Sequence, residues 1–142
     1  MGLSLDGLRR IGYKMTTMER KKRILIVEDD AGSRKLMAIL LSRASYDTIT
    51  AGNAAEAIDR ASHPELVDLI VMDLELPGIT GGEIIRQLKN DPSTNHIPVI
   101  VTTSSDRGSL LVRQAIEAGA DKILYKPTPM AVLMAEVNRY LP

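Results

Sequence analysis

The sequence predicts an α/β domain built on a doubly wound, five-stranded parallel sheet. Short apolar runs alternate with longer amphipathic segments from Ile24 onward. The runs are continuous rather than alternating in polarity, which is typical of strands buried on both faces of a parallel sheet. Because strand and helix patterns follow one another in strict alternation, the chain is expected to form right-handed strand–helix–strand units.

Five segments are predicted to be strands. Four of them are the continuous apolar runs ILIV (24–27), LIVM (69–72), VIV (99–101) and ILY (123–125). The fifth, DTITA (47–51), alternates in polarity and therefore suits a strand at the edge of the sheet. A common order for five such strands is 2-1-3-4-5, the flavodoxin-like arrangement.

Each stretch that follows a strand carries a helix pattern. In the first, Leu36, Ile39 and Leu40 recur at helical spacing and predict the buried face. The second has an expected N-cap at Asn53 with Glu56 three residues later, a capping-box arrangement. The other three patterns have these apolar residues: Ile84, Ile85 and Leu88 after Gly81-Gly82; Leu110, Leu111, Ala115 and Ile116 before Gly119; and Val132, Leu133, Val137 and Leu141 after Thr128-Pro129.

Composition narrows the classes of function. The chain of 142 residues is long enough for one domain with a full hydrophobic core. It has no Cys, which excludes disulfides, thiolate catalysis and cysteine zinc sites and favours a reducing, intracellular setting. With no Phe or Trp and only four Tyr, an aromatic platform for nucleic acid is not expected. The sequence shows neither a membrane-spanning apolar run nor a secretory signal pattern, so we expect a cytoplasmic protein that contacts neither membrane nor nucleic acid.

The net charge of zero hides an uneven distribution. Residues 1–23 carry seven Lys or Arg and two acids, whereas residues 24–142 carry eleven bases and sixteen acids. We therefore divide the chain into a basic N-terminal extension, residues 1–21, and a domain of residues 22–142. A basic arm can contact an anionic surface or a partner. Such arms are more often solvated termini, and we expect this one to be disordered or partly helical.

Polar side chains follow the predicted strands at the point where each strand ends. Glu28 and Asp29 follow the first strand, and Asp73 follows the third. The fourth strand ends in the hydroxyl residues 102–105, and the fifth ends at Lys126. Because the carboxyl ends of parallel strands share one edge of the sheet, where ligands bind, these side chains are expected to lie together.

The carboxylates of Glu28, Asp29 and Asp73 are predicted to converge, since the first and third strands are neighbours about 5 Å apart in this strand order. Two unit charges about 5 Å apart repel by roughly 3 kcal/mol at an effective dielectric constant of about 20. Hence either one carboxyl is protonated or a divalent cation lies among them. An all-oxygen ligand set favours Mg²⁺, with Mn²⁺ as the alternative, over Zn²⁺.

A cation and a hydroxyl complete the group. Lys126 starts two strands from Asp73, about 10 Å away, and its long side chain can cover most of that distance. A metal ion, an ammonium and a hydroxyl around one carboxylate are the parts needed to stabilise a transferring phosphoryl group. Asp73 is then the expected nucleophile, as in enzymes that form an aspartyl-phosphate.

Four motifs occur in a fixed order: ILIVEDD, VMDLELPGITGGE, IPVIVTTS and EAGADKILYKP. Together they resemble the receiver domains of two-component response regulators, over about residues 22–142. The resemblance implies that a histidine kinase or histidine phosphotransfer protein passes a phosphoryl group to the chain in a Mg²⁺-dependent reaction. It also implies a face that switches to bind a downstream target, a signalling protein rather than an enzyme, and a homodimer that can form on phosphorylation.

The resemblance assigns roles to individual acids. Glu28 and Asp29 match the family's acidic pair, and Asp73 matches the phosphorylated aspartate. Asp29 and Asp73 are expected to bind Mg²⁺ directly, together with the backbone carbonyl of Glu75, whereas Glu28 acts mostly through water.

The responding hydroxyl and the lysine come from the last two strands. Counting forward from Asp73 places the hydroxyl at Thr103, which we prefer, whereas counting back from Lys126 gives Ser104. Lys126 matches the family's invariant lysine, whose bond to the following proline is usually cis. The family's switch aromatic falls on Ile123, and we expect the nearby aromatic residue 125 to point to the other side of the sheet.

Several alternatives stay open at this point. The chain is either a stand-alone regulator, which we favour because the last helix pattern runs to Pro142, or the receiver part of a longer transcriptional or enzymatic regulator. A remote alternative is an aspartyl-phosphate hydrolase that uses Glu75 as its general acid. Another is a docking module that is never phosphorylated.

Overall fold

A computed structural model describes residues 21–62 and 66–142 and shows the predicted alternation of strands and helices. The strands are β1 (Arg23–Val27), β2 (Asp47–Ala51), β3 (Leu69–Asp73), β4 (Val99–Thr103) and β5 (Lys122–Tyr125). The helices are α2 (Ala31–Arg43), α3 (Ala54–Ser62), α4 (Gly81–Asn90), α5 (Leu110–Ala118) and α6 (Met130–Tyr140). Nearly all of the extension predicted over residues 1–21 lies outside the described residues. Within the described part, no helix is long and apolar enough to cross a membrane.

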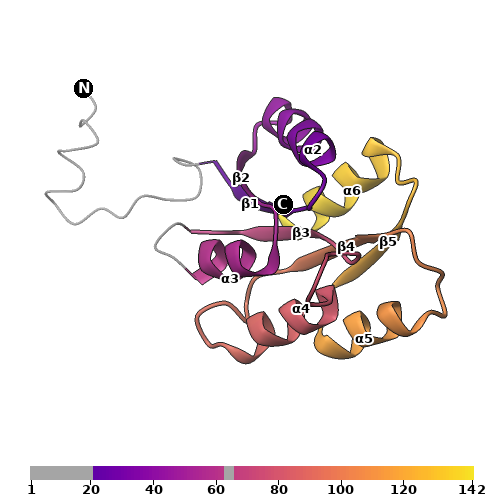
Figure 1. The fold of residues 1–142 in the computed structure, drawn as a ribbon. Coiled ribbons are helices and arrows are strands. Elements are labelled where there is room, and N and C mark those ends of the chain that lie inside the picture. Colours follow the sequence, from indigo (N-terminus) through magenta and orange to yellow (C-terminus); the bar gives the residue numbers. More distant parts are fainter. Residues whose placement is uncertain (1–20, 63–65) are drawn as a thin grey trace, which may run out of the picture.

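The strands form one parallel sheet in the predicted order β2-β1-β3-β4-β5. In Figure 1, α2 and α6 cover one face of this sheet, and α3, α4 and α5 cover the other. β2, whose sequence alternates in polarity, lies at an edge, as predicted. This is the flavodoxin-like α/β fold. It brings the ends of all the strands to one edge of the sheet, which we call the carboxyl edge.

Two apolar cores, one on each face of the sheet, hold the helices in place. Side chains along each strand point alternately to the two cores. Ile24 and Ile26 of β1 belong to the core under α2 and α6, whereas Leu25 and Val27 belong to the core under α3, α4 and α5. Because the inner strands are buried on both faces, their sequences are continuous apolar runs.

The buried face of α2 differs from the sequence prediction. Leu36 and Ile39, expected to be buried, are 58% and 40% exposed. Leu41 is buried instead, and Met37 packs beside it against the core shared with α6. The helix itself was predicted correctly, but its orientation was not, because five of the six residues from 36 to 41 are large and apolar and do not define a single stripe.

Polar caps and one glycine set the helix ends. Asp30 is the N-cap of α2, and its side chain accepts a hydrogen bond from the backbone N–H of Ser33 at 2.8 Å. Half of the predicted capping box at α3 is present, since Asn53 accepts from the backbone N–H of Glu56 at 2.9 Å. The Glu56 side chain accepts instead from the backbone N–H of Gly52 and the side-chain amide of Asn53. Gly119 ends α5 with a φ of 111°, a left-handed conformation that glycine adopts without strain.

The opposite, amino edge of the sheet is tied together by acidic side chains. The backbone N–H of Arg23 donates to Asp68 at 2.7 Å, and the guanidinium of the same residue donates to Asp47 at 2.8 Å. Asp121 accepts a hydrogen bond from the backbone N–H of Val99 at 2.7 Å. These bonds connect the start of β1 to both of its neighbours and the start of β4 to β5.

Candidate functional site

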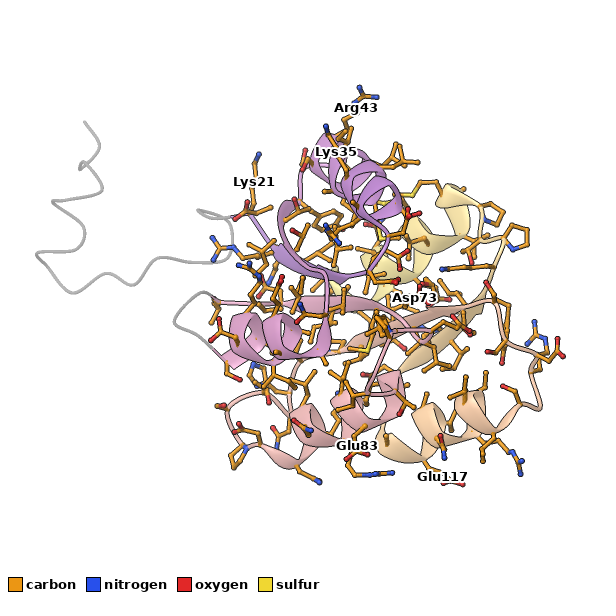
Figure 2. All side chains as sticks on the ribbon, viewed as in Figure 1. Lys21, Lys35, Arg43, Asp73, Glu83 and Glu117 are labelled. Atoms are coloured by element: carbon orange, nitrogen blue, oxygen red, sulfur yellow. The ribbon has the colours of Figure 1, made fainter. Side chains whose placement is uncertain are left out.

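The register of the sheet brings two acidic strand ends together at the carboxyl edge. Val27 of β1 pairs with Met72 of β3, so Glu28 and Asp73 follow side by side. Asp73 is only 6% exposed. Figure 2 shows it among the strand ends in the middle of the molecule, whereas the other labelled charged residues, such as Lys35, extend from the surface.

Three carboxylates crowd together at this edge. Glu28, Asp29 and Asp73 each place one oxygen so that these atoms all lie within 4.8 Å of one another. Glu28 and Asp73 are buried, and Asp29 is exposed. Asp30, the next acid along the chain, caps α2 instead. The structure therefore brings together the three acids that the strand order predicted to converge.

The crowding changes the acidity of Glu28. Burial raises the pKa of Glu28 from 4.5 to about 8, and a hydrogen bond with Asp73 and the charge of Asp73 act in the same direction. Lys126 lowers the same pKa, and Asp29 adds a smaller repulsion. In the absence of a metal ion, Glu28 is therefore mostly protonated at neutral pH. This is one of the two arrangements that the repulsion argument allowed.

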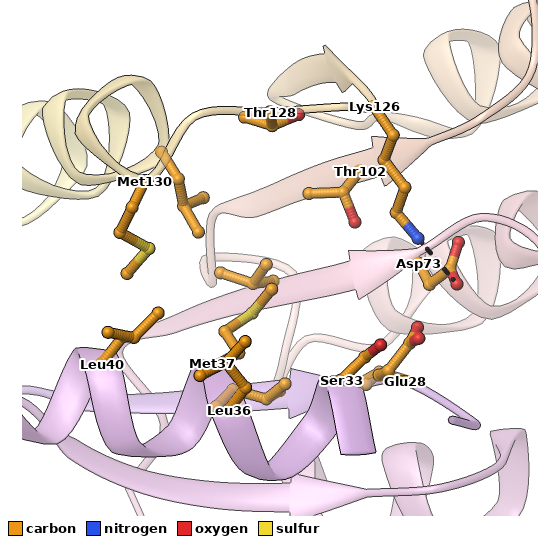
Figure 3. Close-up of a pocket in the computed structure, with 14 residues that line it drawn as sticks. Glu28, Ser33, Leu36, Met37, Leu40, Asp73, Thr102, Lys126, Thr128 and Met130 are labelled. Atoms are coloured by element: carbon orange, nitrogen blue, oxygen red, sulfur yellow. Dashed lines mark hydrogen bonds and ion pairs between the residues drawn. The ribbon is translucent and has the colours of Figure 1, made fainter. Parts of the chain in front are cut away.

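Asp73 is held by one backbone donor and one side-chain donor. Its Oδ1 accepts a hydrogen bond from the backbone N–H of Glu75 at 3.1 Å. Its Oδ2 lies 3.3 Å from Nζ of Lys126, as Figure 3 shows. The ammonium thus reaches Asp73 from two strands away, as its length predicted. The peptide bond between Lys126 and Pro127 is cis, as the family resemblance implied.

The Glu75 side chain is engaged by the loop that follows β4. Its Oε1 accepts hydrogen bonds from the hydroxyls of Thr103 and Ser105, the latter at 2.7 Å. Burial raises the pKa of Glu75, but hydrogen bonds with Asp73 and with residues 103–105 outweigh it and lower the pKa to about 2. The carboxylate is therefore ionised, and it accepts hydrogen bonds from residues 103–105.

The two candidate hydroxyls have different surroundings. Thr103 is fully buried, and its hydroxyl donates to Glu75 rather than to Asp73. Ser104 is exposed, and its backbone N–H lies 3.4 Å from Glu75. The two hydroxyl residues thus differ in burial and in their contact with Glu75.

Thr102 is one of the hydroxyl residues that were predicted to lie at this edge, but it was given no role of its own. This residue pairs with Asp73 in the sheet register, is 5% exposed, and lines the same cavity as Asp73 and Lys126 (Figure 3). Counting residues from Asp73 or from Lys126 assigns the responding hydroxyl to Thr103 or Ser104 and does not consider Thr102. The parallel register of the assembled sheet places it beside Asp73, because residues paired across neighbouring strands point to the same face.

A cavity of about 320 Å³ extends from this group toward α2 and α6. Its polar end has the carboxylates of Glu28 and Asp73, the ammonium of Lys126 and the hydroxyls of Ser33 and Thr102. Its apolar wall has the side chains of Leu36, Met37, Leu40, Met130 and Leu133, several of which are visible in Figure 3. The cavity leaves open space beside the Asp73 carboxylate, on the side of α2 and α6.

Arg34 of α2 supports the backbone that carries the acidic pair. Its guanidinium donates to the carbonyl oxygen of Glu28 at 2.8 Å and lies 3.4 Å from that of Asp29. A Cβ at Gly52 would lie 2.9 Å from this guanidinium, so the glycine after β2 provides the space for it. The sequence alone gave no indication of this contact.

Tyr125 lies on the same side of the sheet as Ile123, contrary to the prediction. Both side chains pack against the core under α3, α4 and α5. The prediction was wrong because residues two apart in a strand face the same way. The guanidinium of Arg107 lies 4.2 Å from the centre of the Tyr125 ring, so an aromatic ring contacts the loop between β4 and α5 from this side.

The donor set fits a hard divalent cation. Glu28, Asp29 and Asp73 offer only oxygen atoms, which Mg²⁺ prefers. Burial and, to a smaller extent, the charge of Asp73 raise the pKa of Glu28, and a cation among these oxygens would favour its ionised form. Asp29 is exposed, which allows water to complete an octahedral shell.

The fold and this site agree with a known family. A family model described as the response regulator receiver domain matches residues 24–138. The chain therefore belongs to the receiver domains, which are signalling phosphoacceptors of two-component systems. Members of this family bind Mg²⁺ at an acidic pocket and interact with histidine kinases and downstream effectors.

Individual relatives support this assignment. The chain is 37% identical over 117 residues to the response regulator PleD of Caulobacter vibrioides, covering 82% of this chain and 25% of PleD. It is 34% identical over 123 residues to the polar-differentiation response regulator DivK of Brucella ovis, covering 84% of this chain and 96% of DivK. A CheY-like receiver domain protein of Methanospirillum hungatei JF-1 has the same fold, with a TM-score of 0.78 at 26% identity over 86% of this chain and 94% of that one. The chain thus spans about a quarter of PleD but nearly all of DivK.

Proposed function

We propose that Asp73 is the residue of this receiver domain that accepts the phosphoryl group. The observation that supports this most directly is a buried carboxylate that lies beside Glu28 and Asp29 and accepts from the ammonium of Lys126 at 3.3 Å. One oxygen of Asp73 attacks the phosphorus of a phosphohistidine, the phosphorus–nitrogen bond breaks, and the imidazole leaves with the electron pair. The product is an aspartyl-phosphate, the same intermediate type that carboxylate nucleophiles form in enzymes.

Asp29 and Asp73, with the backbone carbonyl of Glu75, would hold Mg²⁺ directly, and Glu28 would contribute mostly through water; Mn²⁺ would also fit. When bound, the ion neutralises charge on the oxygens of the transferring group. Lys126, whose Nζ lies 3.3 Å from Asp73, neutralises the same charge from the other side. Glu28 is the group that must release its proton when the cation binds, because burial and Asp73 hold its pKa at about 8 in the metal-free protein.

Thr103 is the hydroxyl that we expect to respond. After transfer, the Thr103 hydroxyl would turn toward an oxygen of the phosphoryl group, and the shift of Thr103 would alter the face formed around β4 and β5. That face would bind a downstream target, and it would also be the surface for a homodimer formed on phosphorylation.

The donor would be a histidine kinase or a histidine phosphotransfer protein in the cytoplasm, without direct contact to membrane or nucleic acid. In this role the chain catalyses only its own phosphorylation and dephosphorylation. A hydrolase that used Glu75 as general acid is less well supported, because the Glu75 carboxylate accepts four hydrogen bonds from residues 103–105. The same chemistry would serve a stand-alone regulator and a receiver that is part of a longer protein.

The proposal is tested by incubating the protein with Mg²⁺ and a small acyl phosphate and measuring its intact mass. We expect one added phosphoryl group in the wild type and none in Asp73→Asn. Asp59→Asn, a change of the same kind on the exposed surface of α3, is the matched control and should be modified like the wild type. An adduct that persists in Asp73→Asn would show that another residue is the acceptor.

A further inference from the structure

One carboxylate gathers three consecutive residues at the end of β4. Oε1 of Glu75 accepts from the hydroxyls of Thr103 and Ser105 and from the backbone N–H of Ser105 at 3.1 Å. Oε2 lies 3.4 Å from the backbone N–H of Ser104. Hydrogen bonds to an ionised acceptor are shorter and stronger than those between neutral groups. The loop that begins at Thr103 is therefore anchored to a residue two positions after Asp73.

The Thr103 hydroxyl has a single proton, and that proton is already used. A threonine hydroxyl donates one hydrogen bond and accepts others. Here Oγ1 of Thr103 donates to Glu75 and accepts from the backbone N–H of Ser105 at 3.0 Å. A phosphoryl group on Asp73 brings only acceptor oxygens. Thr103 can therefore donate to that group only after it has released Glu75.

The same residue is close enough to Asp73 for its carboxylate to oppose a new charge there. The backbone N–H of Glu75 donates to Oδ1 of Asp73 at 3.1 Å, so this carboxylate belongs to a residue that contacts the Asp73 side chain directly. Phosphorylation adds about 1.5 to 2 negative charges at Asp73. Repulsion from this charge then disfavours the resting position of the Glu75 carboxylate. At the same time, the phosphoryl oxygens offer the Thr103 hydroxyl a second acceptor.

We propose that the Glu75 side chain is a positioning residue that holds Thr103 and the loop after β4 in the resting arrangement, so that the phosphoryl group must compete with Glu75 for the Thr103 proton. This inference rests on the proposed roles of Asp73 and Thr103. It assigns to the Glu75 side chain a function separate from that of its backbone carbonyl. Replacing Glu75 shifts the protein toward the arrangement that otherwise requires phosphorylation.

The test uses beryllofluoride, a non-covalent phosphoryl mimic, added with Mg²⁺ to ¹⁵N- and threonine-methyl-labelled protein and followed by NMR. Without beryllofluoride, we expect the Thr103 methyl and the Ser104 and Ser105 amides of Glu75→Ala to move toward their beryllofluoride-bound wild-type positions. The apparent affinity for beryllofluoride should rise about tenfold, which corresponds to the loss of one charge-assisted hydrogen bond in the resting state. Glu75→Gln keeps an acceptor oxygen without the charge, and should give a shift in the same direction but smaller.

Two controls separate positioning from general effects. Glu83→Gln makes the same change of charge on the outside of α4, where the carboxylate pairs with Arg86, and should leave all these values unchanged. In a Thr103→Val background, Glu75→Ala should alter beryllofluoride affinity less than threefold, because the competition no longer exists. If Glu75→Ala does not fold, Ser105→Ala removes one of the bonds and should produce a weaker shift of the same sign.

The outcomes are distinguishable. If the Thr103 methyl of Glu75→Ala stays at its resting position, or if the tenfold effect persists in Thr103→Val, Glu75 does not act through Thr103 and this inference is wrong. In either case the proposed function stands, provided that the wild type binds beryllofluoride with Mg²⁺ and Asp73→Asn does not. If the wild type itself does not bind beryllofluoride, both the proposed function and this inference are overturned.

Discussion

In the protein without a metal ion, the carboxylates of Glu28 and Asp73 repel each other when both are ionised. Both carboxyls are buried. Among the described residues, the cation that pairs with them is Lys126, whose Nζ lies 3.3 Å from Asp73. A proton on Glu28 removes this repulsion. Metal binding at this site is therefore also a deprotonation, which makes Mg²⁺ affinity depend on pH.

The first prediction concerns pH. The pKa of Glu28 is about 8 in the folded protein and 4.5 when unperturbed, so the folded state binds more protons than the unfolded state between these values. The free energy of unfolding of the metal-free protein should therefore fall as pH rises from about 5 to about 8. Urea midpoints measured in EDTA across this range check it. Glu28→Gln should flatten the dependence, and a wild-type midpoint that is constant or rises over this range would contradict the assignment.

The second prediction concerns Lys126. Lys126→Gln removes the ammonium beside Asp73, so the rate of phosphorylation by an acyl phosphate should fall about 100-fold or more, as for other lost electrostatic groups of an active site. The same change leaves the acids less compensated, so Mg²⁺ should bind more tightly. Opposite effects on rate and on metal affinity identify a local electrostatic role. Lys35→Gln, on the exposed surface of α2, is the matched control and should change neither value.

At the scale of elements, the start of α4 is packed directly against the chain that follows β3. A Cβ at Gly81 would lie 2.8 Å from Cδ1 and 3.1 Å from Cα of Leu74, the residue after Asp73. A Cβ at Gly82 would meet its nearest neighbour, the backbone of Ala115, at 3.4 Å, an ordinary contact. The two adjacent glycines therefore differ in how much space surrounds them.

The third prediction compares these glycines. Gly81→Ala should destabilise the protein by about 1–3 kcal/mol, because the backbone of Leu74 must move to admit the methyl group. The same displacement should slow phosphorylation of Asp73. Gly82→Ala should change the free energy of unfolding little. Alanine favours the helix by about 0.5–1 kcal/mol over glycine, and the nearest contact of the added methyl group is at 3.4 Å, with the backbone of Ala115. Urea unfolding and phosphorylation rates of the two variants check this, and equal effects would show that the contact with Leu74 is not limiting.

Sequence patterns predicted the elements well where one physical signal dominated. Buried strands need continuous apolar runs, and these predicted four of the five strands. The strand order was predicted from the common arrangement of five such strands. α2 was placed correctly but rotated, since Leu36 and Leu41 are both apolar and only packing selects between them. At the site, strand ends predicted the acids and Lys126. The position of Thr102 beside Asp73 and the contact of Arg34 with the backbone after β1 were not predicted. Both depend on the assembled sheet: the first on the register of β3 and β4, the second on the space beside Gly52.

At the scale of the whole molecule, metal binding and folding are coupled. The three carboxylates come from the loop after β1 and from the end of β3, so the unfolded chain does not hold them together. A ligand that binds only the folded state stabilises it by mass action. Mg²⁺ is therefore expected to act on the stability of the entire domain and not only on the loop that carries Asp29.

The fourth prediction is a stabilisation by Mg²⁺. At about 100 times its Kd, the ion should add about 2.7 kcal/mol to the free energy of unfolding and raise the Tm by several degrees. Asp29→Asn should lose most of this effect. Asp30→Asn makes the same change one residue later and keeps an N-cap residue at α2, so its response should equal that of the wild type. A response that is equal in both variants would mean that the ion binds elsewhere.

The bonds of Asp68, Asp47 and Asp121 at the amino edge have a mechanical consequence. Each strand is fixed to a neighbour where it begins, far from the residues that would receive and sense the phosphoryl group. Displacement is therefore smallest where the strands start and grows along their length, reaching its maximum in the loops that a kinase or a target would touch. The loops at the carboxyl edge can therefore move while the two apolar cores on the faces of the sheet stay packed.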